Sequence, residues 1–412
     1  MTILSKAAFV KQIESLPPLP SIAHRVLEVT GSPASSAQDL ANVLRGDPII
    51  AAKILRVANS PFYRANQRIT QLTRAVTRLG ITAIRNLVLG ICAQKTLTQN
   101  TFQRVEHEAL WYHAIAVAAA CELIARRIRF DPAEEAFVGG LLHDTGHLAM
   151  LMLQPDRFRS ILYKDAVTTS YLGLERDQFG IDHAEAGFLI LSRWGLPESL
   201  CQLGQRHHIP ETDLAGNGDP LLAIVVLGNI LAHVAGFSLD RPVGPLTRSA
   251  IVAQQLNLSD ADQAKVFNNL EQRVTEAIDM LGDMNIVRPV PRLPECLPEV
   301  AWMRPDGSDP PGLQKALLEQ RGYVVRCVPA SGVTGGVPQG GLILVDWAPQ
   351  DGKGTAALVV DLMRQGHRRI VVLKDLDEGA ASRHRDGRTA ICRIPRLFTM
   401  FDIKWVEEQL RS

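Results

Sequence analysis

The chain has 412 residues, more than one hydrophobic core ordinarily holds, so two or three domains are expected. Its 44 basic and 43 acidic residues leave a net charge of +1, which gives no electrostatic footprint for binding nucleic acid or an anionic membrane. The 6 cysteines lie far apart and form no CxxC pair, a usage typical of a reduced, cytoplasmic protein.

The N-terminal segment contains no apolar signal core, so no signal peptide is expected. The longest apolar run, LLAIVVLGNILAHVAGF (221–237), is interrupted by Asn229 and His233 and is shorter than the roughly 20 residues of a membrane span. The sequence therefore predicts no membrane-spanning helix.

Residues 1–104 show helical periodicity and predict a first set of short helices divided by turns. Asp47 before Pro48 is expected to begin one of these helices, because Pro is well tolerated at the first helical position. Gly80 is expected to end another. This region is the N-terminal part of a helical domain.

Residues 105–283 predict a second helical part. It begins with HEALWYHAIAVAAACELIARRI (107–128), a long helix whose alanine-rich face permits close packing. Asp131 and Pro132 signal the start of the next helix, so the run HDTGH (143–147) is expected to lie on a single helix. Further helices are expected at 182–195, 198–208, 220–236 and 260–282.

Residues 284–297 are rich in proline, which forbids a continuous helix, and predict a linker. Between 298 and 412, short β-type runs alternate with helical ones, which favours a small parallel sheet covered by helices. The expected fold class is therefore mainly α, with an all-helical block followed by a small α/β domain.

His143 and His147 are four residues apart, which places them on one face of a helix, and Asp144 lies about 100° round from His143. Neutral imidazole and carboxylate together suit Zn, Fe, Mn or Ni. A buried His–Asp pair is as often a hydrogen-bonded structural pair, so both interpretations of this segment stay open. More histidines of the same block are placed where they can converge on it: His113, His183, His207 and His208.

Several motifs, taken in order, resemble the HDOD domain, an all-helical relative of the HD and HD-GYP phosphohydrolases. The resemblance covers roughly residues 10–280. Its motifs are LPPLPSIAHRVLEV, DLANVLRGDPIIAAKILRVANSPFY, ITQLTRAVTRLGITAIRNLVLG, GGLLHDTGHLAML and HAEAGFLILSRWGLPESLCQLGQRHH.

The resemblance implies a set of metal ligands. In the catalytic relatives these follow an H...HD...D pattern, and cyclic-dinucleotide phosphodiesterases use further histidines for a second or third metal. The positions of this chain that match are His113, His143, Asp144, His183, His207 and His208.

Two positions depart from the pattern of the catalytic relatives. The closing Asp is replaced by Asn229, a neutral amide that supplies no negative charge and accepts no proton from water at pH 7. The Lys that follows HDxG in the phosphodiesterases is His147, which is a candidate ligand or a residue that supports the ligands. Loss of a carboxylate should weaken metal binding, so no cofactor is certain: retention of a divalent metal (Fe, Mn, Zn or Ni) by the remaining histidines and complete loss of the metal both stay open.

Residues 298–412 resemble a response-regulator receiver, with Asp346 where the phosphate-accepting Asp would lie. The carboxylates that would hold Mg²⁺ after the first strand are replaced by Met303 and Arg304, and the usual hydroxyl residue is Lys374. The stretch before the last strand, LDEGAASRHRDGR, is short and polar for a helix. The resemblance therefore implies a degenerate receiver in which Asp346 is a vestigial position.

The resemblance implies a bacterial cytoplasmic signalling regulator whose helical block binds a protein partner or a small nucleotide ligand without turnover. The alternative is a metal-dependent phosphohydrolase acting on a cyclic dinucleotide or nucleotide. Signalling proteins are the expected partners, and a homodimer stays open. Nucleic acid and membranes are not expected as partners.

Overall fold

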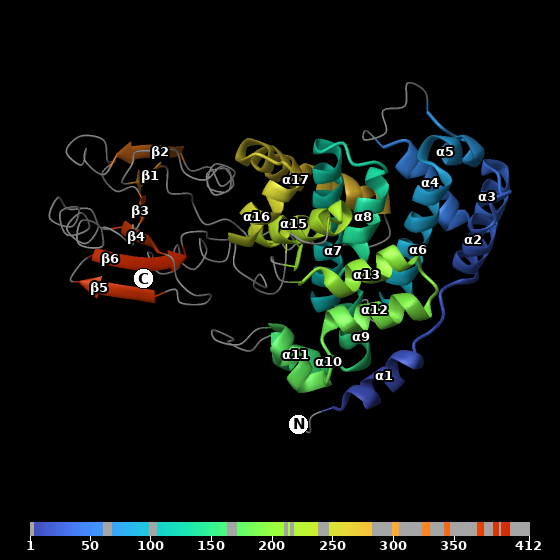
Figure 1. The fold of residues 1–412 in the computed structure, drawn as a ribbon, viewed down its shortest axis with the longest axis horizontal. Coiled ribbons are helices and arrows are strands. Elements are labelled where there is room, and N and C mark those ends of the chain that lie inside the picture. Colours follow the sequence, from blue (N-terminus) through green and yellow to red (C-terminus); the bar gives the residue numbers. More distant parts are fainter. Residues whose placement is uncertain are drawn as a thin grey trace.

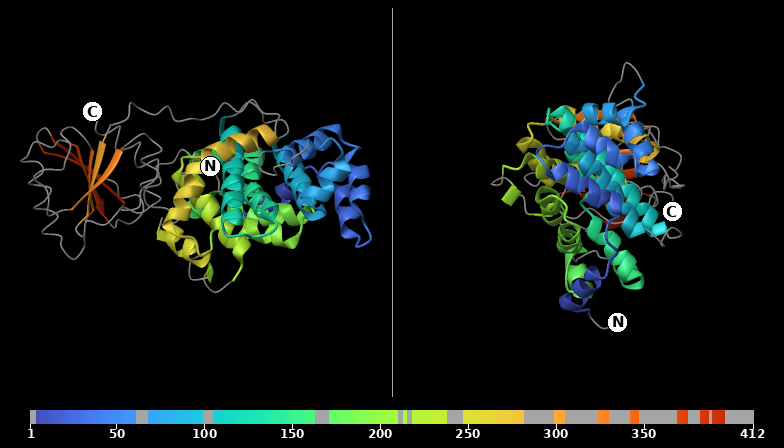
Figure 2. Two further views of the ribbon diagram at one scale, coloured as in Figure 1. Left: turned by 90° about the horizontal axis from the view of Figure 1, so that it is seen from above. Right: turned by 90° about the vertical axis from the view of Figure 1, so that its right-hand side faces the viewer.

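The computed structural model describes residues 4–60, 68–98, 105–162, 171–209, 213–214, 218–237 and 247–281, together with six strands between 299 and 395. The described residues up to 281 are almost entirely helical, and the strands form a separate sheet (Figure 1; Figure 2, left). The predicted fold class is confirmed for the helical block. The predicted linker at 284–297 lies outside the described residues, and the predicted domain boundaries stay predictions.

The first part of the helical block follows the turn chemistry of the sequence. Asp47 caps its helix by accepting hydrogen bonds from the backbone N–H groups of Ile49 and Ile50, and Gly80 ends another with a φ of 88°. The predicted helix start at Asp47 and the predicted helix end at Gly80 are thereby confirmed. The helices are α1 (Lys6–Glu14), α2 (Ser21–Gly31), α3 (Ala37–Leu44), α4 (Pro48–Ala58), α5 (Leu72–Leu79) and α6 (Ile81–Thr98).

The second part surrounds a central long helix, α7, which packs against α8, α15 and α17. Apart from the helix expected to contain HDTGH, every helix expected in this part is present within a few residues of its predicted ends. Its helices are α7 (Val105–Arg127), α8 (Ala133–Leu142), α9 (Thr145–Leu153), α10 (Pro155–Leu162), α11 (Tyr171–Phe179), α12 (His183–Arg193), α13 (Glu198–Arg206), α15 (Pro220–Val234), α16 (Thr247–Gln255) and α17 (Asp260–Leu281).

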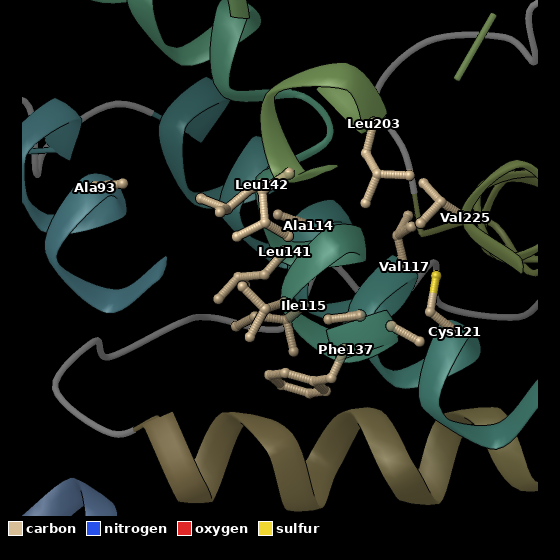
Figure 3. Close-up of a cluster of buried hydrophobic side chains, with 14 of the residues drawn as sticks. Ala93, Ala114, Ile115, Val117, Cys121, Phe137, Leu141, Leu142, Leu203 and Val225 are labelled. Atoms are coloured by element: carbon tan, nitrogen blue, oxygen red, sulfur yellow. The ribbon is translucent and has the colours of Figure 1, made fainter. Parts of the chain in front are cut away.

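Small residues allow these helices to approach closely. A Cβ added to Gly140 of α8 would lie 2.8 Å from the Cα of Ala118 on α7, and one added to Gly228 of α15 would lie 2.6 Å from the Sγ of Cys121. Figure 3 shows the apolar side chains that fill the space around these helix contacts. Ile115 and Leu141 are among them and are fully buried. One continuous apolar core joins both parts of the helical block.

Two stretches, Glu106–Arg127 and Ala133–Leu153, are long and apolar enough to cross a membrane. In the most apolar part of each stretch, 83% is buried inside the fold. Packing against the rest of the protein therefore accounts for the high hydropathy of both stretches. The expectation that no helix spans a membrane stays a prediction.

The strands form one sheet in the order β2-β1-β3-β4-β6-β5. All neighbouring pairs are parallel except β5 with β6, which is antiparallel. The strands are β1 (Glu299–Arg304), β2 (Val324–Pro329), β3 (Leu342–Asp346), β4 (Arg369–Lys374), β5 (Ser382–Asp386) and β6 (Thr389–Pro395).

The order β2-β1-β3-β4 followed by a parallel β6 is that of one class of doubly wound sheets. Asp346 is the last residue of β3, where it was expected. The stretch that replaces a receiver's helix instead contains β5, whose Asp386 pairs with Thr389 of β6; the two residues between them begin with Gly, which favours a tight hairpin. The helices of a receiver would fall outside the described residues, so the receiver resemblance is not shown.

Candidate metal centre

Histidines from four helices and one carboxylate meet inside the second helical part. His113 lies in the middle of α7, His183 begins α12, and His207 follows the last residue of α13. Each is at most 2% exposed, and His143, between α8 and α9, is fully buried. Helices α7, α9, α12 and α13 lie together in the fold (Figure 1). Side chains that are up to 94 residues apart in the sequence thereby come close to one another.

The run HDTGH does not lie on one continuous helix, which corrects the sequence prediction. Helix α8 ends at Leu142 and α9 begins at Thr145. Asp144, between them, has φ −102° and ψ 22°, outside the α-helical region. The break places the Asp144 side chain between His143 and His147.

One oxygen of Asp144 faces three histidines. Its Oδ1 lies 3.3 Å from Nε2 of His143, 3.5 Å from Nε2 of His183 and 3.2 Å from Nε2 of His207. The side chain of Asp144 is 11% exposed, so water has only narrow access to this contact. The carboxylate is the centre of the cluster.

The second oxygen of Asp144 faces two other histidines. Its Oδ2 lies 3.6 Å from Nε2 of His113 and 3.2 Å from Nδ1 of His147. The His113 ring is also 4.8 Å from the ring of His233 on α15, centre to centre. Asp144 therefore lies between His113, which its Oδ2 faces, and His183, which its Oδ1 faces.

Backbone carbonyls fix the orientation of three of these histidines. A carbonyl oxygen only accepts hydrogen bonds, so the Nδ1 atom that contacts it carries the proton and Nε2 carries the lone pair. These pairs are His113 with Phe237 O at 2.7 Å, His143 with Gly140 O at 2.7 Å and His207 with Gly204 O at 2.8 Å.

The arrangement fits a metal ion because several lone pairs that lack a hydrogen bond converge on Asp144. The Nε2 atoms of His113 and His143 and Oδ1 of Asp144 are buried and make no hydrogen bond in the described part of the chain. The Nε2 atoms of His183 and His207 face each other at 3.3 Å. Such acceptors repel one another unless a cation lies among them, and imidazole nitrogen with carboxylate oxygen is a usual donor set for Zn, Fe, Mn or Ni.

The ligand atoms divide into overlapping groups, in each of which all atoms lie within 4.8 Å of one another. Asp144 belongs to two groups, and its two oxygens can serve both. The groups are His113, His143 and Asp144; Asp144, His183, His207 and His208; and His147, Glu175 and His183.

Electrostatics keep the carboxylate ionised. Burial raises the pKa of Asp144, but the neighbouring His143 and His147 outweigh burial and hold that pKa well below its usual range. Burial lowers the pKa of His207, and burial together with His207 and His113 keeps the pKa of His143 well below its usual range. Asp144 is thus ionised and His143 and His207 are neutral, which are the protonation states that metal binding requires.

His147 differs from the other histidines. Its Nδ1 faces Asp144 and its Nε2 lies 2.7 Å from Oε1 of Glu175. Burial lowers its pKa, but Asp144 and Glu175 outweigh burial and raise the pKa of His147 well above its usual range. For Glu175 the signs are reversed. Burial raises the pKa of this carboxyl group, but His183 and His147 outweigh burial and lower the pKa of Glu175 to about 2.

Comparison with known proteins locates this cluster in a recognised domain. Residues 16–210 match the family model of the HDOD domain. This region is an HDOD domain. The matched range contains His113, Asp144, His183 and the pair at 207–208, and the α15 residues lie beyond it.

Solved structures support the HDOD fold over about two thirds of the chain. An HDOD-domain protein of unknown function from Geobacter sulfurreducens is 23% identical with a TM-score of 0.53, and the match covers 67% of this chain and 97% of that one. A protein from Marinobacter aquaeolei VT8, provisionally named a signal transduction protein, is 25% identical with a TM-score of 0.52, over 68% of this chain and 62% of that one.

A curated relative is an uncharacterized protein of Treponema pallidum (strain Nichols), 24% identical over 238 residues. The match covers 54% of this chain and 43% of that protein. This chain therefore spans less than half of the length of that relative.

The structure brings together all six ligand positions expected in the HDOD domain and adds two residues that sequence reasoning missed. Glu175 shares a helix face with the buried Phe179, four residues later, and an acidic residue on an apolar face was the available signal. His233 offered the same kind of signal, since it interrupts an otherwise apolar helix, but the sequence prediction did not include it in the cluster. Asn229 is buried on α15 one turn before His233, and its Oδ1 makes no hydrogen bond among the described residues.

Proposed function

We propose that the HDOD domain of this protein is a divalent-metal-binding signalling module. The observation that carries the proposal is that the Nε2 lone pairs of His113 and His143 converge on Asp144, and that these nitrogens and Oδ1 of Asp144 are buried without a hydrogen bond in the described part of the chain. A structural histidine cluster would use those nitrogens in hydrogen bonds, because buried polar atoms without partners are costly. Fe, Mn, Zn and Ni all suit the donor set.

The ligand groups that share Asp144 are the ones proposed to hold metal. His113 and His143 would bind on one side of the carboxylate. His183 and His207 would bind on the other, together with His208. A carboxylate with two oxygens can bridge the two sides.

Metal content of the purified protein tests this proposal. Elemental mass spectrometry of the wild type should find one or more equivalents of Fe, Mn, Zn or Ni per chain. A His143→Ala, Asp144→Ala double variant should contain little of the metal, whereas His24→Ala, which removes an exposed histidine of α2, should retain it. Equal metal contents in all three proteins would refute the proposal.

A second candidate function, phosphodiester hydrolysis, is favoured by the position of Asp144 between two ligand groups. When bound, metal ions would supply Lewis-acid polarisation of a phosphoryl oxygen and activation of water. This chain would contribute the neutral imidazoles and the ionised Asp144 that hold them. Asn229 argues against efficient turnover, because it provides no negative charge.

Turnover by the metal-loaded protein separates the two functions. Bis(p-nitrophenyl) phosphate and a cyclic dinucleotide are suitable substrates, assayed with wild type and with the His143→Ala, Asp144→Ala variant. Hydrolysis that disappears in the variant would establish the enzyme. A metal-loaded protein that binds a cyclic dinucleotide and leaves it intact would support the signalling module.

The remaining parts of the proposal follow from the sequence. We propose that the protein acts in the cytoplasm of a bacterium, with signalling proteins as partners. The C-terminal sheet, with Asp346 at the end of β3, is proposed to be a receiver-like docking domain that is not phosphorylated. Incubation with acetyl phosphate and Mg²⁺ followed by intact mass measurement should find no added phosphoryl group.

A further inference from the structure

The third ligand group, formed by His147, Glu175 and His183, is built differently from the other two. Glu175 is fully buried and uses both of its oxygens. Oε1 lies 2.7 Å from Nε2 of His147. Oε2 lies 2.7 Å from Nδ1 of His183 and accepts a hydrogen bond from the backbone N–H of His183 at 2.8 Å. The carboxylate therefore holds both the ring and the backbone of the residue that begins α12.

His183 can direct a lone pair to only one side. A neutral imidazole has one protonated nitrogen and one lone pair. If Nδ1 donates to Glu175, the lone pair is on Nε2, which faces Asp144 and the Nε2 atoms of His207 and His208 at 3.3 and 2.9 Å. A metal held by Nδ1 of His183 would reverse this and remove His183 from the Asp144 group.

His147 occupies the space between two carboxylates. Both of its nitrogens face oxygen acceptors, Oδ2 of Asp144 at 3.2 Å and Oε1 of Glu175 at 2.7 Å, so both are placed to donate. Its ring stacks on that of His183 with centres 3.8 Å apart. A ring in this position bridges the two carboxylates by hydrogen bonds and leaves neither of its nitrogens to bind an ion.

We propose that Glu175 is a positioning residue that fixes His183 with Nδ1 protonated and Nε2 directed to Asp144, and that the third group holds no metal. The inference rests on the proposed metal binding at Asp144. Carboxylates commonly orient metal-binding histidines in this way, and their removal typically costs about 10- to 100-fold in metal affinity. Glu175 thus determines which of two competing groups His183 serves.

The tautomer of His183 tests the orienting step without metal. In ¹⁵N-labelled, metal-free protein, long-range ¹H–¹⁵N correlation spectra should identify His183 Nδ1 as protonated and Nε2 as the unprotonated nitrogen. In Glu175→Ala the two tautomers should become mixed. Glu175→Gln, whose amide oxygen can still accept from His183, should retain the wild-type tautomer. A wild-type His183 protonated on Nε2 would overturn the inference.

Metal titration of the same full-length variants tests whether Glu175 is a positioning residue or a ligand. Isothermal titration with Zn²⁺ should give the wild-type number of ions in both variants, with affinity reduced about 10- to 100-fold in Glu175→Ala and less in Glu175→Gln. A loss of one equivalent in both would make Glu175 a ligand and overturn the inference. Glu185→Gln, three residues into α12 and paired with Lys6, is the matched control and should titrate like the wild type.

The two experiments fail in different ways. Absence of Zn²⁺ binding by the wild type would refute the proposed function, yet the tautomer spectra would still report whether Glu175 orients His183. Normal Zn²⁺ binding with an unchanged His183 tautomer in Glu175→Ala would refute the positioning role alone.

Discussion

At the scale of single residues, the role of a histidine depends on which groups its two ring nitrogens contact. His143 donates from Nδ1 to a backbone carbonyl, which leaves a lone pair for a metal. His147, four residues later, has a carboxylate at each nitrogen and becomes a hydrogen-bond bridge. Residue type and spacing do not distinguish these roles, because both depend on atoms brought in from other helices.

Asn229 is expected to limit metal affinity, because an amide replaces the carboxylate of the catalytic relatives. Asn229→Asp should raise Zn²⁺ affinity by about tenfold or more in a calorimetric titration, since an added ligand or supporting carboxylate strengthens a site by this order. Asn268→Asp, on the exposed side of α17, adds the same charge and should leave the affinity unchanged. Equal affinities of Asn229→Asp and wild type would place position 229 outside the metal site.

Glu122 should make stability depend on pH. It is buried on α7, paired with Arg273 at 2.8 Å, and borders a cavity of about 20 Å³, room for about one water. Burial raises the pKa of Glu122 from 4.5 to about 7, although Arg273 opposes the rise. Between pH 4.5 and about 7 the folded state therefore binds more protons at Glu122 than the unfolded state does. The stabilisation that this proton binding gives the folded state is lost as the pH rises through 7.

Urea unfolding of wild type and Glu122→Gln at pH 5, 6, 7 and 8 checks this expectation. The stability of the wild type relative to the variant should fall by on the order of 2 kcal/mol from pH 5 to pH 8 and change little above that. A difference that grows with pH would show that the pKa is lowered in the folded protein.

At the scale of elements, close helix contacts set the geometry of the cluster. Helices α9 and α12 meet where Gly146 faces the backbone of His183, and a Cβ at Gly146 would lie 1.9 Å from the carbonyl oxygen of His183. That distance is far below any van der Waals contact. The glycine therefore determines how near the HDTGH run comes to the start of α12.

Gly146→Ala should separate α9 from α12 and damage the metal site. The added methyl group should cost about 3 kcal/mol or more, since the backbone it meets cannot rotate away. Thermal unfolding and metal content measure the two effects. Gly31→Ala, where an added Cβ meets nothing within 4 Å, should change stability by less than about 1 kcal/mol and retain metal. A Gly146→Ala protein with wild-type metal content would mean that the cluster tolerates this displacement.

At the scale of the whole molecule, the helical block contains its own core. One apolar cluster runs from Phe9 on α1 to Leu281 at the end of α17, and Leu344 of β3 also belongs to it. The HDOD-domain protein from Geobacter sulfurreducens has the same fold, and its match to this chain covers 97% of its own length. The helical block is therefore expected to fold without the C-terminal sheet.

A fragment of residues 1–283 should unfold cooperatively and contain the same metal per chain as the full-length protein. Circular dichroism during heating and elemental mass spectrometry provide the two measurements. Loss of cooperativity or of metal in the fragment would mean that the C-terminal region contributes to the helical domain.

The sequence by itself determined the helical block, because caps such as Asp47 and terminators such as Gly80 act within a few residues of the chain. It also determined that short strands follow residue 298, since short β-type runs depend on local composition. Resemblance named six residues that the structure brings together, and Asp346 at the end of its strand.

Only the tertiary structure decided what those residues can do. The break at Asp144, the buried Glu175, the approach of His233 and the antiparallel β5 depend on contacts between segments far apart in the chain. Spacing on one helix cannot indicate which nitrogen of a histidine carries the proton, because the acceptor that decides it lies on another element. The geometry of the candidate site therefore depends on how the helices pack, even though its six expected residues can be found in the sequence.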